Sequence, residues 1–347
     1  MAQSPRQGRP SVTPVSQPRA ASLACFAFLW LCAAGGVSAA RANPQCQSSR
    51  AAQPAVTRLR DAMAQGRFTA YQPLSLRVVD GRVTDADADG VRADLTELRP
   101  RFDSLITYDA IHGAQQIPAI AAALKFRALI IGVWDPGDAA QLDAALEAAR
   151  RFPRLVVGIS LGNEVLFAHR TDPAALIAVI ARVRARAPEV ALATSEPFHG
   201  YDDPAAAAVL GQLDFLLSIV HPVFQPWFRG APDSTAAQFV VNVLGKLSPL
   251  ACGPLLVKET GVPTAPESAG FSEARQAAFY RELRRVLPPG RTQAFAYFAA
   301  YDAPWRAYDA TGVPGAPGAH PEEAHWGLYD EARHPKAAAR ELPPLAP

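Results

Sequence analysis

The sequence predicts a single-domain (β/α)₈ barrel of the TIM type. Eight short apolar segments recur between residues 68 and 301, and Ala/Leu/Arg-rich segments of helical length separate them. Polar residues follow nearly every apolar segment, and no glycine-rich phosphate loop follows the first, which disfavours an open nucleotide-binding sheet. Repeated strand–helix units imply parallel strands inside and helices outside, so eight of them favour a closed barrel.

The expected strands are, in order, residues 68–71, 104–108, 128–134, 155–162, 190–195, 215–220, 255–258 and 294–301. The clearest helices cover 138–151, 173–187, 234–247 and 272–287, and a shorter one is expected near 55–64. Several begin with a capping side chain, as at Asp172-Pro173 and Ser272. We therefore expect a lead-in over 43–66, the barrel over 67–336, and a surface tail over 337–347, with the Pro/Gly-rich stretch 313–321 as a loop.

The first 42 residues have the pattern of a targeting segment. A basic, Pro/Ser-rich leader reaches Arg19, an apolar run covers 21–37, and Ala40-Arg41-Ala42 resembles a signal-peptidase site. We expect export, to the periplasm or as a secreted protein. The alternative is that the apolar run is kept as an N-terminal membrane anchor.

Charge and cysteine content narrow the class further. Four of the 34 basic residues lie in 1–42, which has no acid, so 30 basic residues face 32 acidic ones in the rest, without a Lys/Arg run. This balance argues against nucleic acid as a partner. Cys25 and Cys32 lie in the targeting segment, which leaves Cys46 and Cys252 either to form a disulfide in an oxidising compartment or to remain two thiols.

No metal or cofactor is expected. Asp85, Asp87, Asp89 and Gly90 open like an EF-hand loop, but Thr96 stands where the closing glutamate should be. We interpret this stretch as a polar turn and the acidic first turn of a helix that ends near Leu98. No Cys/His spacing fits zinc, and neither a nucleophile elbow nor a nucleotide fingerprint is present.

Acids and aromatic residues stand where the expected strands end. They are Tyr71, Tyr108-Asp109, Trp134-Asp135, Asn163-Glu164, Glu196, His221, Glu259 and Tyr301-Asp302. In this fold the loops after the strands carry function. Glu164 and Glu259, each at the tip of an apolar strand, suggest paired carboxylate chemistry. The alternative for each is a strand-end ion pair with an arginine or with Lys258.

Six segments in order resemble family 17 glycoside hydrolases, the β-1,3-glucanase-type barrels, and their bacterial branch in particular. The segments are Leu-Ile-Thr-Tyr at 105–108, Gly-Asn-Glu at 162–164, Thr-Ser-Glu-Pro-Phe-His at 194–199, Val-Lys-Glu-Thr-Gly-Val-Pro-Thr at 257–264, Tyr-Asp-Ala-Pro-Trp at 301–305 and His-Trp-Gly-Leu at 325–328. The resemblance implies a retaining enzyme acting on β-1,3-glucan, with Glu164 as acid/base and Glu259 as nucleophile. A β-glucan transglycosylase and a non-catalytic glycan-binding envelope protein are the alternatives.

The remaining candidates would bind substrate. Asn163 is suited to a sugar 2-hydroxyl. Glu196 would bind sugar hydroxyls or position Glu164; alternatively, backbone groups satisfy its carboxylate. His221 would hydrogen-bond Glu259; alternatively, it is a packed imidazole whose hydrogen bonds are satisfied elsewhere. Ring stacking on sugars, or burial in the core, is open for Tyr71, Tyr108, Trp134, Phe224, Trp227, Tyr301 and Trp305, and we favour Trp227 and Trp305 for the cleft. Val262 and Ala303 depart from the family pattern, which commonly has tryptophan and glutamate there.

Overall fold

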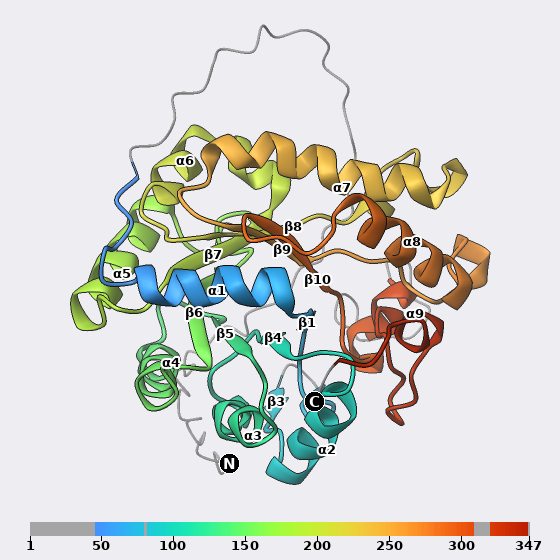
Figure 1. The fold of residues 1–347 in the computed structure, drawn as a ribbon, viewed down its shortest axis with the longest axis horizontal. Coiled ribbons are helices and arrows are strands. Elements are labelled where there is room, and N and C mark those ends of the chain that lie inside the picture. The colour runs from blue at the N-terminus through green and yellow to red at the C-terminus, as the bar shows by residue number, and fades with distance from the viewer. Residues whose placement is uncertain (1–45, 80–81, 309–319, 346–347) are drawn as a thin grey trace, which may run out of the picture.

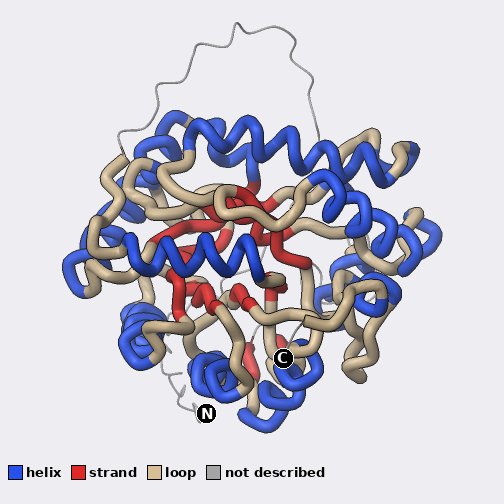
Figure 2. The backbone as a smooth tube through the Cα atoms, in the orientation of Figure 1, coloured by secondary structure: helices blue, strands red, loops and turns tan. Residues whose placement is uncertain are grey.

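A closed barrel of eight parallel strands forms the centre of the molecule (Figures 1 and 2). The computed structural model describes residues 46–79, 82–308 and 320–345. Around the barrel the order is β1 (Phe68–Ala70), β10 (Gln293–Tyr297), β9 (Leu255–Glu259), β8 (Leu216–Ile219), β7 (Leu192–Pro197), β6 (Val156–Asn163), β5 (Ala128–Val133) and β4 (Ser104–Ile106). The predicted single-domain (β/α)₈ barrel is confirmed.

Helices surround the strands on the outside, as Figure 2 shows in blue around red. They are α2 (Ala88–Leu98), α3 (Ile117–Ala123), α4 (Ala139–Arg151), α5 (Pro173–Arg186), α6 (Pro204–Leu210), α7 (Asp233–Leu247), α8 (Glu273–Val286) and α9 (Ala337–Arg340). Asp138, Asp172 and Ser272 accept hydrogen bonds from first-turn N–H groups and so fix three of the helix starts.

One helix precedes the barrel and closes its N-terminal end. This is α1 (Gln53–Gln65), where a short helix was expected, and its Val56, Leu59 and Met63 are buried. These side chains share a cluster with interior residues of the strands, among them Phe68 and Val157. A second, larger apolar cluster lies between the strands and the outer helices. Because α1 closes one end, a ligand can reach the strand tips only from the other.

The last strand is shorter than the sequence suggests. We expected it to run to residue 301, but β10 ends at Tyr297. Beyond it the backbone pairs with another segment: Ala299 N–H donates to Trp326 C=O, and Leu328 N–H donates to Ala299 C=O. The segment after β10 therefore pairs with residues 326–328 on one side, while the Ala300 N–H still donates to Ala70 C=O of β1.

Two further segments differ from expectation. A hairpin of β2 (Arg77–Val79) and β3 (Arg82–Thr84) follows β1. The end of the chain, expected as a surface tail from 337, instead forms α9, where Ala338, Ala339 and Leu342 are buried. The tail prediction was wrong because three successive alanines, residues 337–339, lie in a helix that packs against α8.

Cys46 and Cys252 form a disulfide, with Cα atoms 5.5 Å apart. It ties the chain before α1 to the segment before β9. The Asp85–Asp89 stretch acts as a helix start, since Asp87 Oδ1 accepts the Gly90 N–H at 2.6 Å. Within the described ranges no helix is long and apolar enough to span a bilayer. The expected targeting segment and most of the 313–321 loop lie outside the described residues.

Candidate active site

A cavity of about 310 Å³ opens where the strands end, and both predicted glutamates line it. Glu164 follows β6 and Glu259 closes β9. Asn163, Tyr108, Trp134, His221 and Trp305 line the same cavity. Residues far apart in the sequence thus share one chamber at the open end of the barrel.

The backbone at the end of β6 turns sharply to present Glu164. Gly162 has φ +91° and Glu164 itself has φ +53°, both in the left-handed region. A Cβ on Gly162 would lie 2.6 Å from the Val165 side chain, so glycine is needed there. The Glu164 N–H donates to Ser195 C=O on β7 at 2.7 Å, which holds the turn in place.

Glu259 is surrounded by cationic and donor groups. Lys258 Nζ lies 3.6 Å from its Oε1, and His221 Nε2 lies 3.7 Å from its Oε2. Burial acts to raise the pKa of Glu259, but the neighbouring His221 ring and the Lys258 charge outweigh it and lower that pKa to about 2. The strand-end ion pair with Lys258, weighed as an alternative, is present, and it keeps Glu259 ionised inside the cavity.

Glu164 has the opposite environment. Burial, and next the negative charges of Glu259 and Glu196, raise its pKa to about 7, while Lys258 and Arg170 act more weakly in the other direction. Below neutral pH Glu164 therefore keeps its proton while Glu259 is anionic. That division is what acid-assisted nucleophilic chemistry needs.

Lys258 links the two tips. Its buried ammonium donates to Asn163 Oδ1 and lies 4.1 Å from the centre of the Tyr108 ring. Burial lowers the pKa of Lys258, and the two glutamates act to raise it. Because Asn163 Oδ1 is occupied by Lys258, the Asn163 NH₂ group is left to donate to a ligand.

Glu196 does not line the cavity. Its two oxygens accept the backbone N–H groups of Leu166 and Phe167 at 3.0 and 3.1 Å. Burial raises its pKa to about 7 against these bonds. Direct sugar binding by Glu196, one of the roles expected from the sequence, therefore does not fit this geometry. The Glu196 carboxylate instead holds the loop that follows Glu164.

Two of the expected sugar-binding tyrosines are anchored elsewhere. Tyr71 OH donates to Asp94 Oδ2 at 2.9 Å, and Tyr301 OH donates to Asp94 C=O at 2.7 Å. Both rings are buried, and Tyr71 lines the main cavity whereas Tyr301 does not. Asp94, a buried acid of α2, thus uses both hydroxyls in the structure, and sequence position alone could not show that these hydroxyls are anchored.

The aromatic candidates divide between the cavity and its surroundings. Tyr71, Tyr108, Trp134, Phe224 and Trp305 line the cavity. Arg170 stacks over Trp134, with its guanidinium carbon 4.8 Å from the ring centre. Trp227 lies outside, against Phe239 of α7 at 5.4 Å between ring centres. The structure therefore does not bring Trp227 into the cleft where we expected it.

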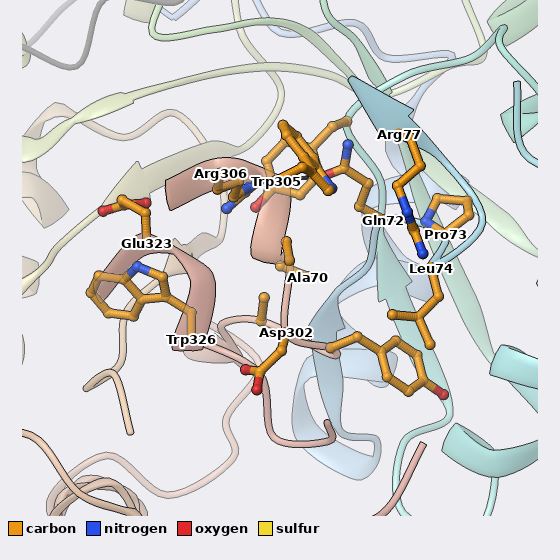
Figure 3. Close-up of a pocket in the computed structure, with 14 residues that line it drawn as sticks. Ala70, Gln72, Pro73, Leu74, Arg77, Asp302, Trp305, Arg306, Glu323 and Trp326 are labelled. Carbon is orange, nitrogen blue, oxygen red and sulfur yellow. Dashed lines mark hydrogen bonds between the residues drawn. The ribbon is translucent and has the colours of Figure 1, made fainter. Parts of the chain in front are cut away.

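Three cavity residues, Arg306, Glu323 and Trp326, were not singled out from the sequence. They also line a smaller pocket of about 20 Å³ beside the cavity, where Figure 3 shows Glu323 next to Trp326 and Arg306 next to Trp305. The Trp326 ring is 4.7 Å from His221. Trp326 lies in one of the six motifs and Arg306 directly follows another, so the motifs could have indicated both as site residues. Glu323 comes from a segment without a strand pattern, and no sequence signal indicated it.

The comparisons with known proteins agree with this geometry. The chain is 26% identical over 278 residues to a glucan 1,3-beta-glucosidase of Arthroderma benhamiae, covering 76% of this chain and 87% of the relative. Its fold is similar to a glycoside hydrolase family 17 beta-1,3-glucanosyltransferase of Rhizomucor miehei, with a TM-score of 0.58 and 21% identity over 79% of this chain and 96% of the other. An active-site mutant of the same enzyme, in complex with laminaritriose, also gives a TM-score of 0.58, with 20% identity over the same shares of the two chains.

These similarities confirm the resemblance to family 17 glycoside hydrolases. The family described as the BtgE/BtgC glycoside hydrolase domain matches residues 69–327. That match runs from β1 to the segment beyond β10 and contains both cavity glutamates, so the chain belongs to the BtgE/BtgC glycoside hydrolase domain family.

Proposed function

We propose that this protein cleaves β-1,3-linked glucan with retention of anomeric configuration, using Glu259 as nucleophile and Glu164 as acid/base. One observation carries the proposal: Glu164 and Glu259, at the ends of two barrel strands, line one cavity, and of these two Glu259 has a lysine and a histidine within 4 Å. The substrate class rests on the glucan 1,3-beta-glucosidase relative.

In the first step Glu259 attacks the anomeric carbon while Glu164 gives its proton to the leaving oxygen. The glycosidic C–O bond breaks and a glycosyl ester of Glu259 forms. The ester is neutral, so the negative charge that helps raise the pKa of Glu164 is gone. Glu164 then takes a proton from water, which attacks the same carbon and releases Glu259 as a carboxylate.

Asn163 and Lys258 support this sequence. Lys258 holds Asn163 by its oxygen, which directs the Asn163 NH₂ group to a sugar hydroxyl, the 2-hydroxyl by the family resemblance. The same ammonium keeps Glu259 anionic. The pair thereby couples substrate positioning to the ionisation of the nucleophile.

Purified protein incubated with laminarin-type glucan tests the proposal. We expect release of reducing ends, with the first product in the β-configuration by NMR. Glu259→Gln and Glu164→Gln should each lower turnover by at least about three orders of magnitude without lowering the melting temperature. Glu147→Gln, at an exposed glutamate of α4, is the matched control and should retain full activity.

The other candidate functions give different results in the same assay. Products longer than the starting oligosaccharide indicate transfer of the glycosyl group to a sugar in place of water. Binding without turnover over the whole pH range indicates a glycan-binding protein. Wild-type activity in either purified glutamine variant refutes the assigned roles.

We also propose that residues 1–42 direct export, to the periplasm or outside the cell, and that 67–336 is the catalytic barrel. The Cys46–Cys252 disulfide supports an oxidising compartment. N-terminal sequencing of the protein from the producing cell tests this: a start near residue 43 indicates cleavage, whereas an intact, membrane-bound N-terminus indicates an anchor.

A further inference from the structure

The surface beside α7 carries an aromatic platform that the catalytic cavity does not include. Trp227, 36% exposed, packs against Phe239, and four uncharged polar residues of α7 complete a hollow of about 450 Å³. We call this the α7 patch; its members are Trp227, Ser234, Thr235, Gln238, Phe239 and Asn242. In Figure 1, α7 is the yellow-to-orange helix at the top.

The helix face of the α7 patch is regular and uncharged. Ser234, Gln238 and Asn242 follow each other at four-residue steps, so they form one exposed row, and Gln238 Nε2 donates to Asn242 Oδ1 at 3.1 Å. Among the residues that the structure describes, no Lys, Arg, Asp or Glu lines the hollow. Amides and hydroxyls beside an exposed indole match a sugar, whose C–H face stacks on a ring while its hydroxyls hydrogen-bond.

The α7 patch is connected to the cleft. Phe224, three positions before Trp227, is 59% exposed and lines the catalytic cavity. A second connection runs through a series of neighbouring aromatic rings. Phe167, in the loop after Glu164, contacts His199 with 5.3 Å between ring centres, and His199 contacts Phe198. Phe198 in turn contacts Phe239 with 5.6 Å between ring centres, and Phe239 contacts Trp227. The segment that carries Phe224 (Pro222–Phe224) contacts α7, so the exposed ring at the cavity and the α7 patch lie on neighbouring segments.

We propose that the α7 patch is an accessory binding site for a distal segment of a long β-glucan chain whose reacting end occupies the catalytic cavity. This inference rests on the proposed function. It distinguishes a polymer from a trisaccharide, because only a chain that extends beyond the cavity contacts Trp227.

Binding in the Glu259→Gln background, where turnover is absent, provides the test, with laminarin and laminaritriose as probes in calorimetry. Adding Trp227→Ala should weaken laminarin binding about tenfold, the loss of one aromatic stacking contact, while laminaritriose affinity changes less than about twofold. Trp227→Phe should restore most of the laminarin affinity. Gln238→Ala should weaken laminarin alone, whereas Gln53→Ala, at an exposed glutamine of α1 on the closed end of the barrel, should weaken neither probe.

Equal losses for both probes, or unchanged laminarin binding in Trp227→Ala with an unchanged melting temperature, overturn the accessory site. The failure of the proposed function looks different: wild-type protein then releases no sugar from laminarin or laminaritriose. If wild-type protein cleaves both and Trp227→Ala matches it on both, the accessory site alone is wrong.

Discussion

Replacing Lys258 by methionine should shift the whole pH profile of activity to higher pH. Catalysis requires ionised Glu259, so activity is lost as the pH falls through the Glu259 pKa, and it requires protonated Glu164, so activity is lost as the pH rises through the Glu164 pKa. In the wild type these pKa values are about 2 and about 7. Lys258 lowers both of them, and its removal therefore moves both limbs in the same direction.

The size of the shift follows from the distance. Lys258 Nζ lies 3.6 Å from Glu259 Oε1. With an effective dielectric constant of about 20, two unit charges at this distance interact by ~4.6 kcal/mol. Since ~1.4 kcal/mol corresponds to a tenfold change in an ionisation constant, the acidic limb should move from about pH 2 toward about pH 5. The basic limb should move to higher pH by a smaller amount, because Lys258 affects the pKa of Glu164 less than burial, Glu259 and Glu196 do.

The assay is kcat/KM on a β-1,3-linked oligosaccharide from about pH 3 to about pH 9. Lys336→Met is the matched control, because Lys336 is equally buried and pairs with Asp302 at 2.6 Å, away from the two glutamates. Both variants lose one partner of a buried ion pair, yet only Lys258→Met should move the pH limits. An acidic limb that stays in place or moves to lower pH refutes the electrostatic account of Glu259.

Three other predictions concern stability and positioning. Gly162→Ala should lower the free energy of unfolding by at least about 1–2 kcal/mol in urea titrations, because the φ of Gly162 is +91°. The control Gly245→Ala, on the exposed face of α7, should raise the free energy of unfolding by about 0.5–1 kcal/mol. Equal effects of the two substitutions contradict the backbone argument. Replacing Cys46 and Cys252 by serine should lower the free energy of unfolding by about 2–5 kcal/mol, measured as a lower melting temperature. A reducing agent should lower the melting temperature of the wild type in the same way. An unchanged melting temperature contradicts the disulfide. Glu196→Gln should lower kcat by about tenfold to a hundredfold with little effect on the melting temperature. The reason is that an amide has one acceptor oxygen, whereas the Glu196 carboxylate accepts two backbone N–H groups. Full activity of this variant refutes the positioning role of Glu196.

The barrel and its two central residues were accessible from the sequence. Strand period and helix caps are local properties, and polar residues after apolar runs mark the strand ends that meet at one rim. Glu164 and Glu259 stand out for this reason. The boundary of β10 could not be predicted, because Ala299 pairs with Trp326 and Leu328 of a later segment, and no local pattern encodes that choice.

By itself, therefore, the sequence determined the alternation of strands and helices, and with it the rim on which both glutamates stand. Only the tertiary structure decided what surrounds each side chain: that Tyr71 and Tyr301 serve Asp94, that Glu196 holds a loop, and that Trp227 faces outward over α7. The physical reason is that burial and partner charge are set by residues distant in the chain. Glu164 and Glu259 are the same amino acid, and their pKa values separate because Lys258 and His221 lie within 4 Å of Glu259, whereas burial and the charges of Glu259 and Glu196 prevail at Glu164.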